Sequence, residues 1–171
     1  MGPQPHPNPL VAIDSNVPLD LADGNEPVLD ALNTIRARLT NVRFVVTPSV
    51  FQELAHVALH DSAAARRALG RSALRRLNQW RFDVLEIVPV GHGIVESIAR
   101  RLRVAGLLPE EEVHDSLILA EAALLGCAVL LTSDAHLRGL DYARLTWVLN
   151  ACDVSVPVIA TPREIVRKFF R

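Results

Sequence analysis

Four acidic residues stand where the apolar pattern of the chain gives no reason for a charge: Asp14, Glu53, Asp115 and Asp134. Carboxylates about 4 Å apart repel by roughly 4 kcal/mol at an effective dielectric near 20. A group of four therefore needs either raised pKa values or a divalent cation. Because all-oxygen ligation favours Mg²⁺ or Mn²⁺, and such ions activate water and support in-line displacement, the pattern indicates phosphodiester hydrolysis.

The stretch 110–137 shows how two of these acids are positioned. Pro109 and the acids at 110–112 suit a helix N-terminus, apolar residues follow at helical spacing, and Gly126 ends the helix. The apolar run 128–131 is typical of a strand that is covered on both faces. If helix and strand pack antiparallel, the first turn of the helix, with Asp115, lies beside the strand's carboxyl end, with Asp134.

The rest of the chain alternates in the same way. We expect strands at 10–13, 43–46, 84–88 and 156–159, helices at 26–39, 62–79, 94–104, 142–150 and 162–170, and a turn over 18–24. Ser49 is expected to cap the helix that carries Glu53. Alternating strands and helices predict an α/β fold, a three-layer α/β/α sandwich around a central parallel sheet of four to five strands. In such sheets ligands bind at the carboxyl ends of the strands, where the strand order reverses.

Length and composition indicate one cytoplasmic domain that is large enough to bury a core of its own. The chain has 171 residues, of which we assign 1–9 to a flexible proline-rich tail and 10–171 to a single domain. The net charge of −1 argues against a wholly basic nucleic-acid binder, although it allows a local basic face. Two cysteines are too few for a disulfide framework or a zinc site, and no apolar stretch is long enough to span a membrane.

Four motifs, in this order, resemble the PIN-domain ribonucleases: Asp14-Ser15-Asn16 after the first strand, TPSVFQEL with Glu53, VHDSLILAEA with Asp115, and LLTSDAHL with Asp134. The resemblance extends from Leu10 to Arg171. By size and layout, the VapC-type toxins of bacterial toxin–antitoxin pairs are the most similar branch, although the chain is somewhat long for that branch and residues 61–81 are unusually rich in arginine.

The resemblance implies a function and a set of roles. The four acids would be the catalytic ligands of Mg²⁺ or Mn²⁺ in an endoribonuclease that cleaves single-stranded RNA. Asn16 and Ser133 match polar positions that support these ligands. An antitoxin protein and a second copy of the chain are the expected partners.

Several alternatives stay open. The chain could be an RNA-processing nuclease that is not a toxin, or a catalytically silent binding protein with the same fold. A phosphotransfer or receiver protein is a further alternative, but Asn16 stands where a phosphatase of the haloacid dehalogenase type needs a second Asp. The arginines at 67, 71 and 75 recur every four residues, so they form either a solvated helix face or a phosphate-contacting one.

Overall fold

The computed structural model describes residues 8–169 and places its strands in one parallel sheet. Within that range, five strands lie in the order β3-β2-β1-β4-β5, and every neighbouring pair is parallel. Ile13 pairs with Leu131, which aligns the carboxyl ends of β1 and β4. The bounds of the strands are β1 Leu10–Ile13, β2 Arg43–Val46, β3 Phe82–Val84, β4 Val129–Leu131 and β5 Val158–Ala160. The strand order reverses at β1, which is where this class of sheet binds its ligands.

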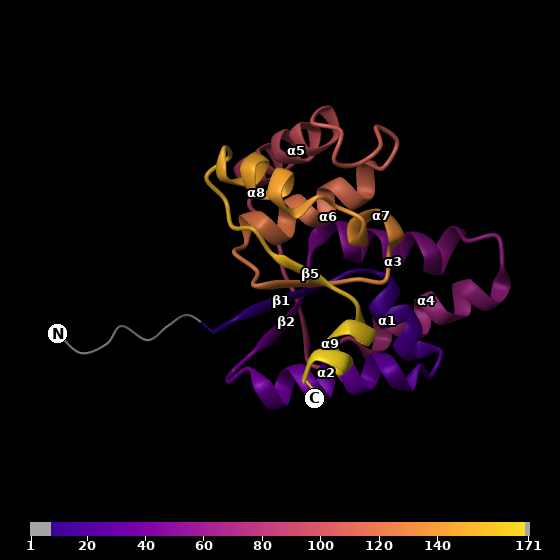
Figure 1. Cartoon of the computed structure of the whole chain (residues 1–171). Coiled ribbons are helices and arrows are strands. Elements are labelled where there is room, and N and C mark those ends of the chain that lie inside the picture. Colours follow the sequence, from indigo (N-terminus) through magenta and orange to yellow (C-terminus); the bar gives the residue numbers. More distant parts are fainter. Residues whose placement is uncertain (1–7, 170–171) are drawn as a thin grey trace.

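Helices cover both faces of the sheet, so the expected three-layer α/β/α architecture is confirmed. Figure 1 shows α1, α2 and α9 on one side and α3, α5, α6 and α8 on the other, with α4 packed beside α3. The bounds are α1 Asn16–Ala22, α2 Glu26–Arg38, α3 Pro48–His60, α4 Ala64–Arg76, α5 Pro89–Val104, α6 Val113–Leu124, α7 Ala135–Arg138, α8 Tyr142–Asn150 and α9 Pro162–Phe169.

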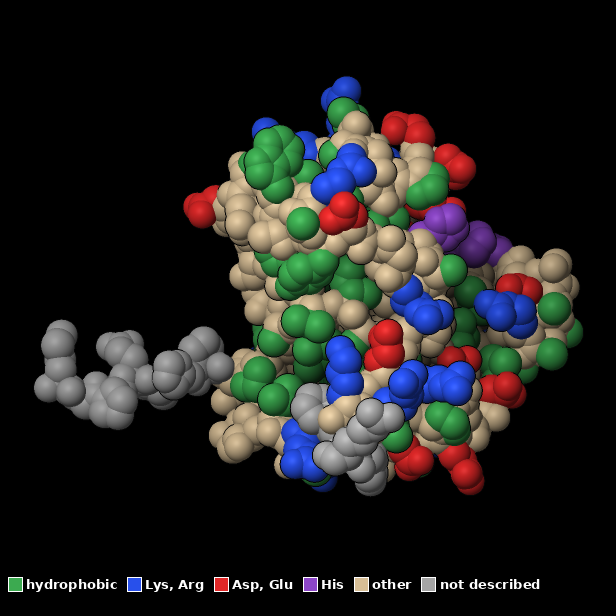
Figure 2. All heavy atoms as spheres, viewed as in Figure 1, with side chains coloured by type: hydrophobic (Ala, Val, Ile, Leu, Met, Phe, Trp, Pro, Cys, Tyr) green, Lys and Arg blue, Asp and Glu red, His purple; other side chains and the backbone are tan. Residues whose placement is uncertain are grey.

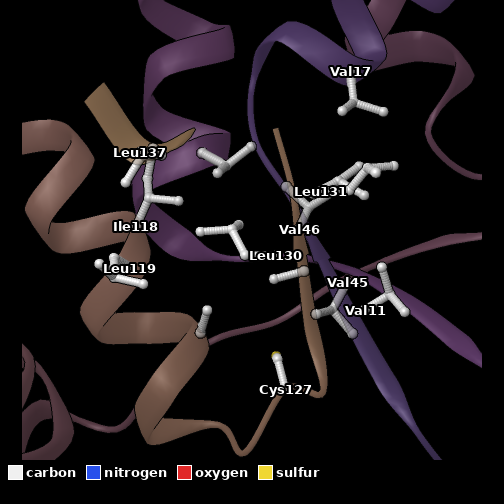
Figure 3. Packing of buried hydrophobic residues seen from close by; sticks show 14 of the residues in the cluster. Val11, Val17, Val45, Val46, Ile118, Leu119, Cys127, Leu130, Leu131 and Leu137 are labelled. Atoms are coloured by element: carbon white, nitrogen blue, oxygen red, sulfur yellow. The ribbon is translucent and has the colours of Figure 1, made fainter. Parts of the chain in front are cut away.

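A core of aliphatic side chains fixes α6 against the sheet. Ile118 and Leu119 of α6 are fully buried, as are Leu130 and Leu131 of β4. Figure 3 shows that these α6 side chains face β4, and Cys127 belongs to the same cluster of buried residues. Burying a large aliphatic side chain stabilises the fold by about 1.5–3 kcal/mol, so the antiparallel packing of α6 on β4 is firmly held.

Several local predictions are wrong, including the helix start expected at residue 94, because α5 begins at Pro89. Residues 18–24 do not simply turn the chain, because α1 runs to Ala22 before the turn at Gly24. Pro18 is buried in the first turn of α1, where the absence of its N–H breaks no helical hydrogen bond. The third strand is Phe82–Val84 rather than 84–88, because Phe82 is the residue that packs into the core, while Val88 is 67% exposed.

A further error concerns the start of α3. Thr47, rather than Ser49, occupies the N-cap position in an extended conformation, and Pro48 begins the helix. The Ser49 side chain instead donates a hydrogen bond to Glu121. Most of the predicted tail at 1–9 lies outside the described residues. Residue 170, the expected end of the last helix, also lies outside them.

Candidate nuclease site

Asp14 forms the buried centre of the site at the end of β1. Its side chain is 3% exposed, and it accepts hydrogen bonds from the Ser15 amide at 2.7 Å and the Thr132 hydroxyl at 2.6 Å. Burial raises the pKa of Asp14, and the negative charges of Glu53 and Asp134 raise it further. The hydrogen bonds from Thr132 and Ser15 act in the opposite direction. A carboxylate in this environment is stabilised by a nearby cation.

A network of polar groups ties the end of β1 to the end of β4. The Asn16 side-chain amide donates to Asp14 Oδ2 at 2.9 Å, and the Ser133 backbone amide donates to Asn16 Oδ1 at 3.3 Å. The fully buried Thr132 hydroxyl donates to Asp14 and accepts from the Asp134 backbone amide at 2.9 Å. The network therefore fixes the two strand-end acids relative to each other.

Thr132 is the residue that sequence reasoning did not assign to the site. The prediction named Ser133 and Asn16 as supporting residues, and the structure places both beside the acids, although Ser133 acts through its backbone amide. Thr132 follows the apolar strand directly, just before these positions, and its strand-end position was the available signal. Only the packing of β4 beside β1 reveals that its hydroxyl reaches Asp14.

Asp134 also begins α7. Its Oδ1 atom accepts hydrogen bonds from the backbone amides of His136 at 2.7 Å and Leu137 at 3.2 Å. This side-chain cap holds Oδ1 toward the helix. Its second carboxylate oxygen has no hydrogen bond to the described residues, so that oxygen is available to a ligand.

Asp115 and Glu53 bring the other two carboxylates from α6 and α3. The pKa of Asp115 is raised to about 7, chiefly by burial. The negative charges of neighbouring acids also contribute, in the order Asp134, Asp14, Glu112 and Glu53. Each of the four predicted acids therefore interacts electrostatically with at least one of the others. The antiparallel packing of α6 on β4 places Asp115 near Asp134, as the sequence pattern indicated.

The donor set suits a hard divalent cation. The four carboxylates supply only oxygen atoms, as Mg²⁺ and Mn²⁺ prefer, and their mutual repulsion is of the kind that such an ion relieves. Among residues 8–169, however, no three side chains of His, Cys, Asp or Glu lie close enough in this structure to hold an ion between them. Coulombic effects extend over about 8–10 Å, whereas a bond to Mg²⁺ spans only about 2.0–2.1 Å. The four acids are therefore close enough to influence one another's charge, but their oxygen atoms are too far apart to coordinate one ion in this structure.

The arginine-rich helix α4 makes contacts within the protein. Arg67 donates hydrogen bonds to the carbonyls of Asp61 and Ser62, and Arg71 donates to the Ala58 carbonyl at 3.1 Å. These carbonyls lie at or just beyond the end of α3, where backbone acceptors lack helical partners. Arg67 and Arg71 therefore help cap the C-terminal end of α3. That these two arginines contact RNA together with Arg75 stays a prediction.

A second buried carboxylate lies on α6 away from the four acids. Glu121 is 2% exposed and accepts hydrogen bonds from the Ser49 amide at 3.2 Å and the Ser49 hydroxyl at 2.8 Å. Negative charge at the first turn of a helix is favourable, so Glu121 joins α6 to the N-terminus of α3. It thereby anchors the helix that carries Glu53.

Comparisons with solved structures give the same architecture. The chain is similar to a structure of VapBC2 from Rickettsia felis bound to a DNA fragment from its promoter, with a TM-score of 0.60 and 12% identity over 89% of this chain and 98% of that one. It is also similar to VapBC-1 from nontypeable Haemophilus influenzae, with a TM-score of 0.56 and 17% identity over 90% and 98% of the two chains. A search of curated proteins finds no significant match.

The sequence itself carries the signature of a family. The profile of the PIN domain matches residues 11–141, a span that runs from β1 to just beyond α7 and includes all four acids. This span holds three-quarters of the chain, and the structural comparisons agree with it in fold. The chain therefore belongs to the PIN domain family of nucleases.

Proposed function

We propose that this protein is a metal-dependent endoribonuclease that cleaves single-stranded RNA at Asp14, Glu53, Asp115 and Asp134. The observation that carries the proposal is the electrostatic grouping of four acids, from β1, α3, α6 and the β4–α7 junction, at one edge of the sheet. A bound Mg²⁺ or Mn²⁺ ion would polarise the phosphodiester and activate the attacking water.

The protein's own residues prepare this chemistry. Asp14 is held by Thr132 and Asn16, and Asp134 is held by the first turn of α7, so two carboxylates are oriented before any ligand arrives. Such pre-organisation avoids the cost of reorienting groups during the reaction. When no cation is bound, the pKa of Asp115 is about 7, so its carboxyl group exchanges a proton near neutral pH.

We further propose that the nuclease is the toxin of a toxin–antitoxin pair and that it works as a homodimer. What supports the toxin role is the likeness in fold to structures of VapBC complexes, whereas the homodimer rests on the family resemblance alone. The test is co-expression with the product of any small reading frame that is encoded beside this one. A stable complex in which RNA cleavage is suppressed would support the toxin role, whereas cleavage that no neighbouring product affects would favour an RNA-processing nuclease.

The nuclease activity is tested with purified protein, labelled single-stranded RNA and Mg²⁺ or Mn²⁺. We expect cleavage that stops on chelation and is lost in Asp14→Asn and Asp134→Asn, because each substitution removes a negative charge at nearly constant shape. Asp30→Asn on the exposed face of α2 is the matched control and should cleave normally. Absence of cleavage across diverse RNAs with both metals, in protein whose melting temperature Mn²⁺ does not raise, would refute the proposal in favour of a silent binding protein.

A further inference from the structure

A pocket of about 300 Å³ lies between α1, α2, α7 and α9, and it adjoins the four acids only at Ser133, the residue before Asp134. Its wall includes Ser133, Arg138 of α7 and Arg163 of α9. Ser133 directly precedes Asp134 and donates its backbone amide to Asn16, so the pocket adjoins the Asp134 side of the site. Its volume lies at the lower end of the range of about 300–1,000 Å³ that is usual for ligand pockets.

The two arginines in this wall have hydrogen-bond donors that no described residue accepts. Most of the other arginines donate hydrogen bonds to groups of the protein itself. Arg43, for example, forms an ion pair with Asp83 at 2.9 Å, and Arg71 donates to a carbonyl at the end of α3. Within the described residues, neither Arg138 nor Arg163 has a hydrogen bond or an ion pair. Both side chains are exposed, so their donors are available to a ligand.

The acids near the pocket offset this positive charge only in part. Glu164 interacts electrostatically with Arg138, but its Oε2 atom already accepts the Thr161 amide at 2.8 Å. Asp20 is the acid among the lining residues, and its pKa is raised by burial and by Asp23. Figure 2 shows basic and acidic side chains intermixed on this face of the molecule. Two cations and one carboxylate thus line the pocket, and Glu164 is a second acid nearby.

We infer that this pocket is a subsite for a backbone phosphate of the nucleic-acid strand, next to the phosphate that is cleaved. The inference rests on the proposed nuclease function. A strand whose scissile phosphate lies at the acids must continue past them, and the Ser133 side of the site leads directly to Arg138 and Arg163. Guanidinium groups bind phosphate oxygens with paired, charge-assisted hydrogen bonds.

The subsite explains how an acidic site can hold a polyanion. The four carboxylates repel a phosphate until a cation binds, so affinity for the strand must come from elsewhere. Arginines that bind a neighbouring phosphate would supply this affinity without taking part in bond cleavage. Their removal should therefore weaken binding and raise KM, while kcat changes little.

The binding experiment uses the Asp14→Asn protein, so that the strand stays intact, and a fluorescent single-stranded RNA with about ten nucleotides. Adding Arg138→Ala and Arg163→Ala should weaken binding roughly tenfold and reduce the salt slope by about 0.7 for each lost phosphate contact. The matched control is Arg100→Ala, an exposed arginine on α5 in the opposite helix layer, which should change neither quantity. An unchanged dissociation constant and salt slope in the double variant would overturn the inference.

Two further arms separate this inference from its alternatives. A poly-glutamate peptide that binds through the two arginines, while RNA binding does not depend on them, would show that the pocket takes a protein segment and would overturn the phosphate subsite. In the active protein, cleavage with an unchanged KM in the double variant would refute the subsite alone. No cleavage by the unmodified protein would instead refute the nuclease function. Unchanged melting temperatures confirm that the variants are folded.

Discussion

Asp115 is expected to destabilise the metal-free protein, so Asp115→Asn should make that protein more stable. The pKa of Asp115 rises from 3.8 to about 7 because of burial and because of the charges of Asp134, Asp14, Glu112 and Glu53. A shift of about three units, at 1.36 kcal/mol per unit, corresponds to about 4 kcal/mol. Because the side chain is only partly buried, solvent screening reduces this to about 2 kcal/mol.

The sign of the pH dependence follows from proton binding. Between pH 3.8 and about pH 7 the folded protein holds a proton on Asp115 that the unfolded chain releases. The contribution of this carboxyl group to stability is therefore fully present below pH 3.8 and is lost as the pH rises through about 7. The asparagine variant lacks this loss, so its advantage should grow with pH and level off at about pH 8.

The assay is denaturant unfolding with a chelator present, at several pH values between about 4 and 8. We expect the variant to exceed the wild type by about 2 kcal/mol at the upper end and by little at the lower end. Asp30→Asn serves as the control for replacing an exposed acid. A variant that is equally or less stable at about pH 8, or an advantage that does not depend on pH, would refute the claim that burial and the neighbouring acids disfavour the charged form of Asp115.

Three other substitutions test the supports of the site. Thr132→Val removes the hydroxyl that joins the two strand-end acids and should lower cleavage about 10–100-fold in kinetic assays, whereas Thr132→Ser should restore it. Glu121→Ala leaves the amide and hydroxyl of Ser49 without their acceptor and should cost about 3 kcal/mol in denaturant unfolding; a loss under about 1 kcal/mol would contradict the role of this anchor. In Gly70→Ala the new Cβ would lie 2.8 Å from a backbone nitrogen of α3, so melting should show a loss of about 1–3 kcal/mol, while Gly93→Ala, which meets nothing within 4 Å, should not destabilise α5.

Much of the fold was predictable because its signals are local. Alternating apolar runs and helical stripes indicated the parallel sheet, and acids that follow short apolar strands indicated the edge at which ligands bind. The antiparallel packing of α6 on β4 follows from the short connection at Gly126, and it brings Asp115 near Asp134. The boundaries that failed, at 18–24 and 84–88, are places where burial against other elements decides which apolar residues are used.

The amino-acid order alone determined the four acids, their polar neighbours and the class of sheet that carries them, because charge and hydrophobic period can be read along one dimension. Only the tertiary structure decided that Thr132 binds Asp14, that Glu121 anchors α3, and that Arg138 and Arg163 face a pocket while Arg67 and Arg71 close a helix. The physical reason is that a side chain's partner depends on which elements pack beside it, and residues more than a hundred positions apart along the chain meet only when β1 pairs with β4.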